Sequence, residues 1–357
     1  MTNQHTLFPQ VQEYYSDLSE HLKRAQEKIS MVFLAFDDGV WARKIAGILS
    51  DRAAAGVHVR LMVDGYGEFT DNLRHVFQNR KLLARLEAAG VRVHVFQPHA
   101  RGLGPLNRMH CKITAIDGGT AYLGGSNLGD YYTSWNDTNL RVDGQLAETF
   151  HELFDHLCHF SETAQPALEF DASDLQAGSD RIRLTIPRRT HDIRNALLHL
   201  IRGAEKAIYI RTWYFLPDPE MLDLLCEQAQ RGIRVHILLS DDTRLRPVDL
   251  ANHVYVHRLV KAGAQVYRYR ASYMHAKVAW NDRGDVLLGS ANLDPHSMHG
   301  NFESCLQFRD GALCADLLRA FEADLPLSIH QAEESYTRRS LPKKALIHAC
   351  TMTASWL

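Results

Sequence analysis

The pattern of apolar and polar positions predicts helices that alternate with strands along the chain. A first helix is indicated by apolar residues at helical spacing, namely Val11, Tyr14, Tyr15, Leu18, Leu22 and Ala25. The apolar run at residues 29–36 is typical of a buried strand. Further strands are expected at 57–63, 91–96 and 140–142, and further helices around 41–49, 82–86 and 146–157. This alternation favours an α/β fold, with a mixed sheet flanked by helices.

The same order of segments occurs a second time. Residues 205–210 resemble residues 27–29 and the strand that follows, and residues 231–236 resemble residues 55–60. The offset falls from 178 (Glu205 against Glu27) to 165 (His275 against His110), so the copies differ only by small insertions. A duplicated α/β unit is therefore predicted.

Two similar halves should pack about a pseudo-twofold axis and share one active site. The stretch 161–180 is rich in Ala, Ser, Asp and Gln and contains Pro and Gly, which is typical of a linker. We expect a first half at 1–165, a second half at 166–330 and a tail at 331–357.

One constellation is repeated with its spacing intact. The first copy contains His110, Lys112, Asp117, Gly124-Gly125-Ser126 and Asn127, and the second contains His275, Lys277, Asp282, Gly289-Ser290-Ala291 and Asn292. In each copy Lys follows His by two residues, Asp follows Lys by five, and Asn follows His by 17. A lone His-x-Lys is usually structural, but a doubled four-part match indicates chemistry.

The spacing places these side chains on a β-hairpin. Apolar residues follow each His, and Asp with Gly then predicts a turn. His and Lys two apart share one face of a strand, and the returning strand brings Asn beside them. Asp117 and Asp282 lie at the turns, where Asp often only bonds the backbone, so a structural role and a supporting role both stay open.

An imidazole, an ammonium and an amide that converge suit a phosphate ester. Lys binds an anion as a point charge, and Asn adds hydrogen-bond donors. Imidazole can act as a nucleophile or carry a proton near neutral pH. Two facing copies would supply the two imidazoles that a two-step displacement needs.

These residues resemble the phospholipase D superfamily, whose signature is His-x-Lys-x4-Asp-x6-Gly-(Gly/Ser)-x-Asn. The resemblance implies two phospholipase D-like halves, with His110, Lys112, Asp117, His275, Lys277 and Asp282 as the catalytic set. It implies phosphate binding or support by Asn127, Asn292 and Ser290. An acidic residue of the family bonds the catalytic imidazole, and Asp137 and Glu303 stand near its place.

The segment 210–218 is similar to bacterial cardiolipin synthases, as are Tyr66 and Trp135-Asn136-Asp137. This branch resemblance implies a phosphatidyltransferase that joins phosphatidylglycerol to a second phospholipid or glycerol-bearing acceptor. His110 would attack phosphorus to form a phosphohistidine, and His275 would protonate the leaving alcohol. For Trp213 and Phe215, core packing is the favoured interpretation. Asp294, Ser297 and Asn301 are plausible pocket-lining residues.

Composition narrows the alternatives. A net charge of −2 over 357 residues argues against an extensive nucleic-acid surface and so against a nuclease of the same superfamily. A phospholipase D hydrolase and a catalytically idle lipid-binding scaffold remain alternatives. The six Cys show no metal spacing and are expected to be reduced, and neither a metal nor another cofactor is expected.

The chain shows neither a signal pattern at its start nor an apolar run of the ~18 residues needed to span a bilayer. Its end combines a basic cluster, Arg338 to Lys344, with a short apolar segment and Trp356. This suits an anionic membrane surface, although a frayed tail or a subunit contact is an open alternative. A cytoplasmic enzyme, peripheral on the inner membrane, is expected, without nucleic acid as a partner. The sequence does not indicate an oligomeric state.

Overall fold

The computed structural model describes residues 3–67, 75–97, 103–104, 106–163 and 175–353. The first sheet has the strand order β1-β7-β6-β5-β2-β3-β4, and β2, β3 and β4 run parallel. Its strands are β1 (Gln4–Gln10), β2 (Lys28–Phe33), β3 (His58–Asp64), β4 (Arg92–Phe96), β5 (Ile113–Ile116), β6 (Thr120–Gly124) and β7 (Asn136–Asp143). Its helices are α1 (Val11–Arg24), α2 (Val40–Ala54), α3 (Val76–Ala88) and α4 (Leu146–Thr163).

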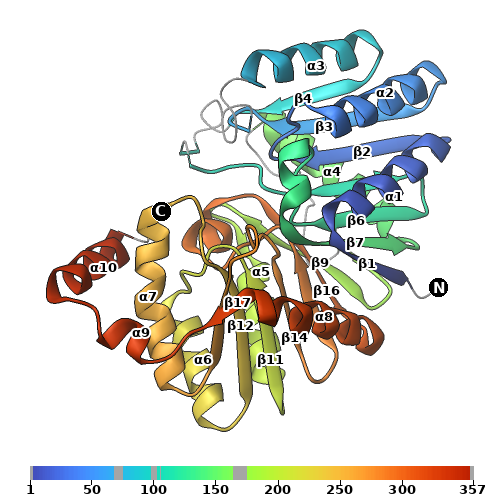
Figure 1. Cartoon of the computed structure of the whole chain (residues 1–357). Coiled ribbons are helices and arrows are strands. Elements are labelled where there is room, and N and C mark those ends of the chain that lie inside the picture. Colours follow the sequence, from blue (N-terminus) through green and yellow to red (C-terminus); the bar gives the residue numbers. More distant parts are fainter. Residues whose placement is uncertain (1–2, 68–74, 98–102, 105, 164–174, 354–357) are drawn as a thin grey trace.

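The second sheet repeats this plan in the order β10-β9-β16-β15-β14-β11-β12-β13-β17, with β8 beside β9. Its strands are β8 (Gln176–Ala177), β9 (Asp180–Ile186), β10 (Thr190–His191), β11 (Ala207–Thr212), β12 (Arg234–Ser240), β13 (Gln265–Tyr269), β14 (Val278–Asn281), β15 (Asp285–Gly289), β16 (Glu303–Arg309) and β17 (Ser328–His330). Its helices are α5 (Asp192–Gly203), α6 (Pro219–Gln230), α7 (Arg246–Lys261) and α8 (Gly311–Asp324), and α9 (Glu334–Thr337) and α10 (Leu341–Thr353) follow. The two halves lie one above the other in Figure 1, and α10 lies at the left edge of that view.

Each sheet is covered on both faces. Helices α1, α2 and α3 pack on one face of the first sheet, and α5, α6 and α7 pack on the corresponding face of the second. Helices α4 and α8 lie on the opposite faces, and their apolar residues share one core with strand residues from both halves. Phe150 and Phe154 of α4 and Phe321 of α8 belong to this shared core, so the halves are held together by hydrophobic burial.

The predicted α/β fold of two similar halves is confirmed, because the strands of the first sheet come from residues 4–143 and those of the second from residues 176–330. The exact boundaries of the halves stay a prediction. Much of the predicted linker, residues 164–174, and the terminal Trp356 lie outside the described residues. Strand β1 was not predicted, and its pairing with β7 extends the first sheet by an edge strand.

Candidate active site

Each motif histidine sits where the backbone of one half forms hydrogen bonds with the backbone of the other half. The backbone N–H of His110 donates to the carbonyl of Phe302 at 2.9 Å. The backbone N–H of His275 donates to the carbonyl of Asn136 at 2.7 Å. These bonds belong to short parallel bridges, Met109 with Phe302 and Asn136 with Met274. The residue after each bridge partner is acidic, namely Glu303 and Asp137.

The two carboxylates therefore reach across the interface. Nδ1 of His110 lies 2.9 Å from Oε2 of Glu303, and Nδ1 of His275 lies 2.7 Å from Oδ2 of Asp137. A carboxylate on Nδ1 fixes the imidazole tautomer and leaves Nε2 available for chemistry. The sequence singled out both carboxylates, and the structure adds that each serves the histidine of the other half.

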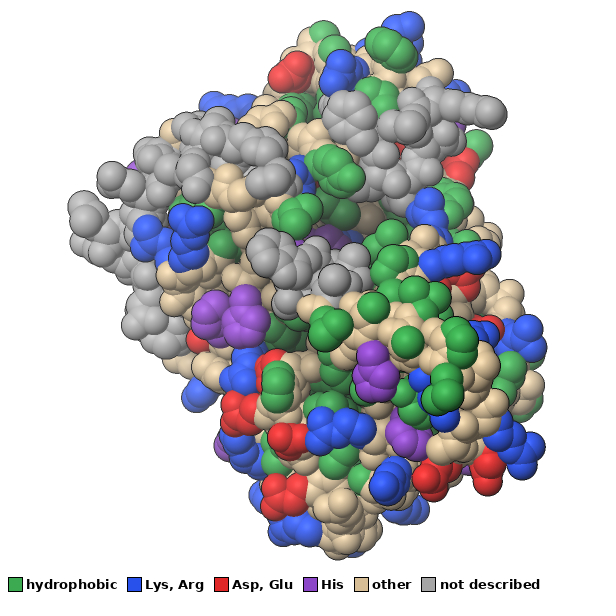
Figure 2. Space-filling view, turned by 90° about the vertical axis from the view of Figure 1, so that its left-hand side faces the viewer, with side chains coloured by type: hydrophobic (Ala, Val, Ile, Leu, Met, Phe, Trp, Pro, Cys, Tyr) green, Lys and Arg blue, Asp and Glu red, His purple; other side chains and the backbone are tan. Residues whose placement is uncertain are grey.

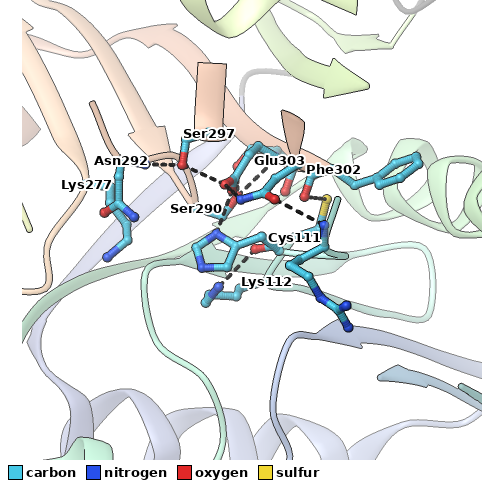
Figure 3. Close-up of polar contacts among 12 residues, drawn as sticks. Cys111, Lys112, Lys277, Ser290, Asn292, Ser297, Phe302 and Glu303 are labelled. Carbon is cyan, nitrogen blue, oxygen red and sulfur yellow. Dashed lines mark hydrogen bonds and ion pairs between the residues drawn. The ribbon is translucent and has the colours of Figure 1, made fainter. Parts of the chain in front are cut away.

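Hydroxyl groups hold both carboxylates. Ser290 Oγ donates to Oε2 of Glu303 at 2.5 Å and Ser297 Oγ donates to Oε1 at 2.8 Å (Figure 3). Ser126 Oγ donates to Oδ2 of Asp137 at 2.9 Å. Gly125 has to be small, because a Cβ there would lie 2.1 Å from Oδ1 of Asp137. Both carboxylates are fully buried, and burial alone would raise the pKa of each, but the neighbouring imidazole and lysine outweigh it and lower the pKa.

Both motif lysines are buried and bonded to the motif backbone. Lys112 Nζ donates to the carbonyl of His110 at 2.9 Å, and Lys277 Nζ donates to the carbonyl of His275. Burial, with repulsion from Lys112, lowers the pKa of Lys277 to about 7 despite nearby Asp137 and Glu303. An anion bound beside Lys277 would favour its charged form, because opposite charges attract strongly in a buried site.

The two imidazoles differ in environment. The side chain of His110 is 13% exposed and that of His275 is 2% exposed. The ring of His275 packs against Trp135 and Trp213, with centroids 4.8 and 4.6 Å away. Burial, with repulsion from Lys277, lowers the pKa of His275 to about 3, and burial also lowers the pKa of His110. His110 is thus the more accessible imidazole.

Both histidines and both motif asparagines line one cavity of about 420 Å³. Asp294, Ser297 and Asn301 line it as well, as the sequence suggested. Oδ1 of Asn292 is buried, and it has no hydrogen-bond partner among the described residues. This unsatisfied acceptor thus belongs to a residue of the cavity lining.

Several cavity residues were missed by the sequence reasoning. Arg108, Arg244, Leu245 and His296 contribute to the lining. Arg108 directly precedes the motif, which was an available signal, whereas Arg244 and Leu245 lie in a loop after β12 that carries no motif.

Trp213 packs against the apolar core of the first half, as predicted, and it also lines the cavity beside His275, where Lys277 Nζ lies 5.5 Å from its ring centroid. Phe215 is a core residue, as predicted, with no exposed surface.

Asp117 and Asp282 hold turns. Asp117 accepts the backbone N–H groups of Gln26, Glu27 and Lys28 at 2.8–3.0 Å. Asp282 accepts those of Glu205, Lys206 and Ala207 at 2.9–3.1 Å. Each carboxylate thus ties a motif hairpin to the start of the neighbouring antiparallel strand, β2 or β11. These contacts favour the structural role at the turn for both aspartates over direct participation in the catalytic set.

Comparison with known proteins agrees with this geometry. Residues 18–158 and 197–325 match the family model described as "Cardiolipin synthase, PLD-like domain". Cardiolipin synthase 1 of Bacillus cereus is 28% identical over 354 residues, which span 93% of this chain and 68% of that protein. The major cardiolipin synthase of Bacillus subtilis is also 28% identical, over 92% of this chain and 70% of that protein.

The fold is similar to a solved structure, the phosphatidylserine synthase of Haemophilus influenzae. The TM-score is 0.77 at 13% sequence identity, and the match covers 99% of this chain and 95% of that one. At this identity the likeness shows the fold alone. Since the family model matches most of the chain in both halves, the chain belongs to the phospholipase D-like family of cardiolipin synthases.

Proposed function

We propose that this protein is a phospholipase D-type phosphatidyltransferase that makes cardiolipin from phosphatidylglycerol. The observation that carries the proposal is the pair of imidazoles in one cavity, each bonded through Nδ1 to a carboxylate of the other half. The relatives named as cardiolipin synthases support the choice of substrate.

In the first step, neutral His110 attacks the phosphorus of phosphatidylglycerol through Nε2. The bond between phosphorus and the headgroup glycerol oxygen breaks, and His275 gives its Nε2 proton to that oxygen. The product is a phosphatidyl-histidine and free glycerol. The greater exposure of His110 supports its role as nucleophile, since the nucleophile has to reach phosphorus.

His275 has to carry a proton for this step. Burial and the ammonium of Lys277 oppose the imidazolium and lower the pKa of His275 to about 3. A phosphodiester anion between the lysines cancels part of that repulsion and raises the pKa of His275. Proton uptake therefore accompanies substrate binding.

In the second step, a headgroup hydroxyl of another phosphatidylglycerol attacks the phosphohistidine. His275 accepts the proton of that hydroxyl, the bond between phosphorus and nitrogen breaks, and cardiolipin forms. Lys112 and Lys277, with Asn127 and Asn292, stabilise the charge on the non-bridging oxygens in both steps.

The test is incubation of the purified protein with phosphatidylglycerol vesicles, with chelator present, followed by thin-layer chromatography. Cardiolipin together with released glycerol is expected. Phosphatidic acid as the main product would instead identify a hydrolase. Degradation of single-stranded DNA in a parallel reaction, without lipid turnover, would identify a nuclease.

No helix within the described part of the chain is long and apolar enough to cross a membrane. Since phosphatidylglycerol is a bilayer lipid, we place the enzyme as a peripheral protein on the cytoplasmic face of the inner membrane.

A further inference from the structure

Helix α10 carries an apolar face on its outside. The exposed residues of 341–352 are Leu341, Pro342, Lys343, Ala345, Leu346, His348, Ala349 and Met352, and all except Lys343 and His348 are apolar. Leu341 is 80% exposed, Leu346 53% and Met352 77%. A surface helix normally turns its polar side to water, so this orientation indicates a further contact.

The opposite side of α10 fixes it to the protein. Helix α10 packs along α7, and Ile347 has no exposed surface. Cys350 packs against a small cluster of Leu216, Val248 and Ala251, and Tyr214, which lines the active-site cavity, packs against the same cluster. The apolar face is therefore presented by a docked helix that is linked to the cavity lining through this cluster.

The rim of the cavity also exposes apolar side chains. Tyr66, Leu106 and Leu245 line the cavity and are 42–54% exposed. The guanidinium of Arg108 lies 4.8 Å from the ring centroid of Tyr66, and that of Arg244 lies 5.3 Å from the ring centroid of Tyr131. Aromatic rings paired with cations suit the boundary between lipid headgroups and acyl chains.

The rim and α10 belong to one side of the molecule. Helix α10 lies at the left of Figure 1, and Figure 2 views the molecule from that side. Figure 2 shows a hollow between the two halves with histidine in its depth, hydrophobic side chains around it and a broader hydrophobic area on the lower half.

The charge near α10 selects the kind of partner. Residues 338–352 contain Arg338, Arg339, Lys343 and Lys344 and lack any Asp or Glu. Arg338 and Lys343 are exposed. Glu333 and Glu334 precede this cluster, and none of the residues of α10 is acidic. An apolar helix face beside a basic cluster is complementary to an anionic bilayer surface.

We propose that the outer face of α10 and the cavity rim together form the bilayer docking surface, with α10 lying in the plane of an anionic membrane and the cavity opening onto the lipid headgroups. The proposal rests on the proposed function for its reason to reach phosphatidylglycerol in a membrane. It adds which face docks and assigns a role to the tail that follows the second half.

The experiment compares the full-length wild type with Leu346→Glu and Met352→Glu. Ile329→Glu is the matched control, because Ile329 is 42% exposed in β17, outside α10 and the rim. Cosedimentation is measured with vesicles of phosphatidylglycerol and phosphatidylcholine, and with vesicles of phosphatidylcholine alone. Turnover is measured separately on short-chain phosphatidylglycerol below its critical micelle concentration.

Wild type and Ile329→Glu are expected to bind the anionic vesicles equally, and both α10 variants to bind at least tenfold more weakly. Lys343→Ala should lose about fivefold in binding at low salt, and less at high salt. Turnover of the monomeric substrate should stay within twofold of wild type in every variant, which excludes misfolding as the cause.

Wild-type binding by Leu346→Glu and Met352→Glu would overturn the proposal. It would also fail if light scattering without lipid showed a wild-type dimer that Leu346→Glu dissociates, because the face would then belong to a second copy of the chain. Vesicle binding with the expected variant pattern but without turnover of any phosphatidylglycerol would uphold the docking surface and refute the proposed function.

Discussion

Oδ2 of Asp137 lies 2.7 Å from Nδ1 of His275, although 138 residues separate the two in sequence and they belong to different halves. The mirror contact joins Glu303 to His110. Neither half contains a complete catalytic pair, so the duplication produced one site that depends on the interface between the halves.

Asp137→Asn and Glu303→Gln should each keep the fold and lower kcat. An amide of the same shape can hold the imidazole in the wrong tautomer and stabilises an imidazolium poorly. We expect a loss of about 10²–10⁴-fold in kcat with a smaller change in KM. Steady-state kinetics with a thermal melt of each variant checks this, and Glu322→Gln, an exposed carboxylate on α8, is the control. Near-normal kcat in both variants would refute the assigned role.

The activity should decline on the alkaline side. Burial lowers the pKa of Lys277 to about 7, so in the free enzyme the side chain of Lys277 loses its positive charge as pH rises through that value. We expect kcat/KM for the anionic lipid to fall above about pH 7. The fall in kcat should lie at higher pH, because bound phosphate raises the pKa of the ammonium. Coincident profiles for kcat and kcat/KM would contradict this.

The same group predicts a pH dependence of stability. Between about pH 7 and 10.5 the unfolded chain keeps Lys277 protonated while the native state does not, so the contribution of this residue to stability rises with pH. Chemical denaturation at several pH values should show that Lys277→Met flattens this trend. An unchanged pH dependence in the variant would exclude Lys277 as the source.

Asp117→Ala and Asp282→Ala should affect stability more than chemistry. Each substitution leaves three backbone N–H groups without their carboxylate, which costs about 1–3 kcal/mol. At a temperature where the variants are folded, we expect kcat within about tenfold of wild type, far above the level of the Asp137 and Glu303 variants. A loss of kcat as large as that of His110→Ala would return these residues to the catalytic set.

A buried ion pair also supports the bridge between Asn136 and Met274. Arg211 Nη2 donates to Asn136 Oδ1 at 2.7 Å and to Asp324 Oδ2 at 2.6 Å, beside the backbone bond that holds His275. Arg211→Met alone should destabilise the protein by about 3–5 kcal/mol, since Asp324 would remain buried without its cationic partner and would keep only the hydrogen bond from Asn136 Nδ2. The double variant Arg211→Met/Asp324→Leu should recover much of that loss in denaturant titrations. If the single variant unfolded like wild type, the pair would have no structural importance.

Much of the fold and of the site followed from local sequence signals. Apolar and β-branched composition, followed by turns that contain Asp and Gly, identified the motif hairpins, and a repeated spacing identified His110, Lys112 and their counterparts. Asp137 and Glu303 were identified through the resemblance to the phospholipase D superfamily, because they stand near the place of its acidic residue after the motif asparagines. Which carboxylate serves which histidine depends on how the halves dock, and that tertiary relationship has no local signature.

The misses have similar causes. The place of Trp213 in the cavity lining was missed, because where the cavity opens depends on how the two halves pack. Strand β1 is an edge strand whose pairing with β7 is long-range. Arg244 lies in an irregular turn with a φ of 65°, which apolar patterning does not reveal.

Rapid-quench trapping with phosphatidylglycerol that is labelled in its phosphate tests the shared site most directly. The account predicts a labelled phosphohistidine in the wild type that maps to the peptide containing His110, and slower labelling of His275→Ala, because His275 protonates the leaving glycerol oxygen. It predicts an unlabelled protein in His110→Ala. Label on His110→Ala, or label that maps to His275 in the wild type, would contradict it.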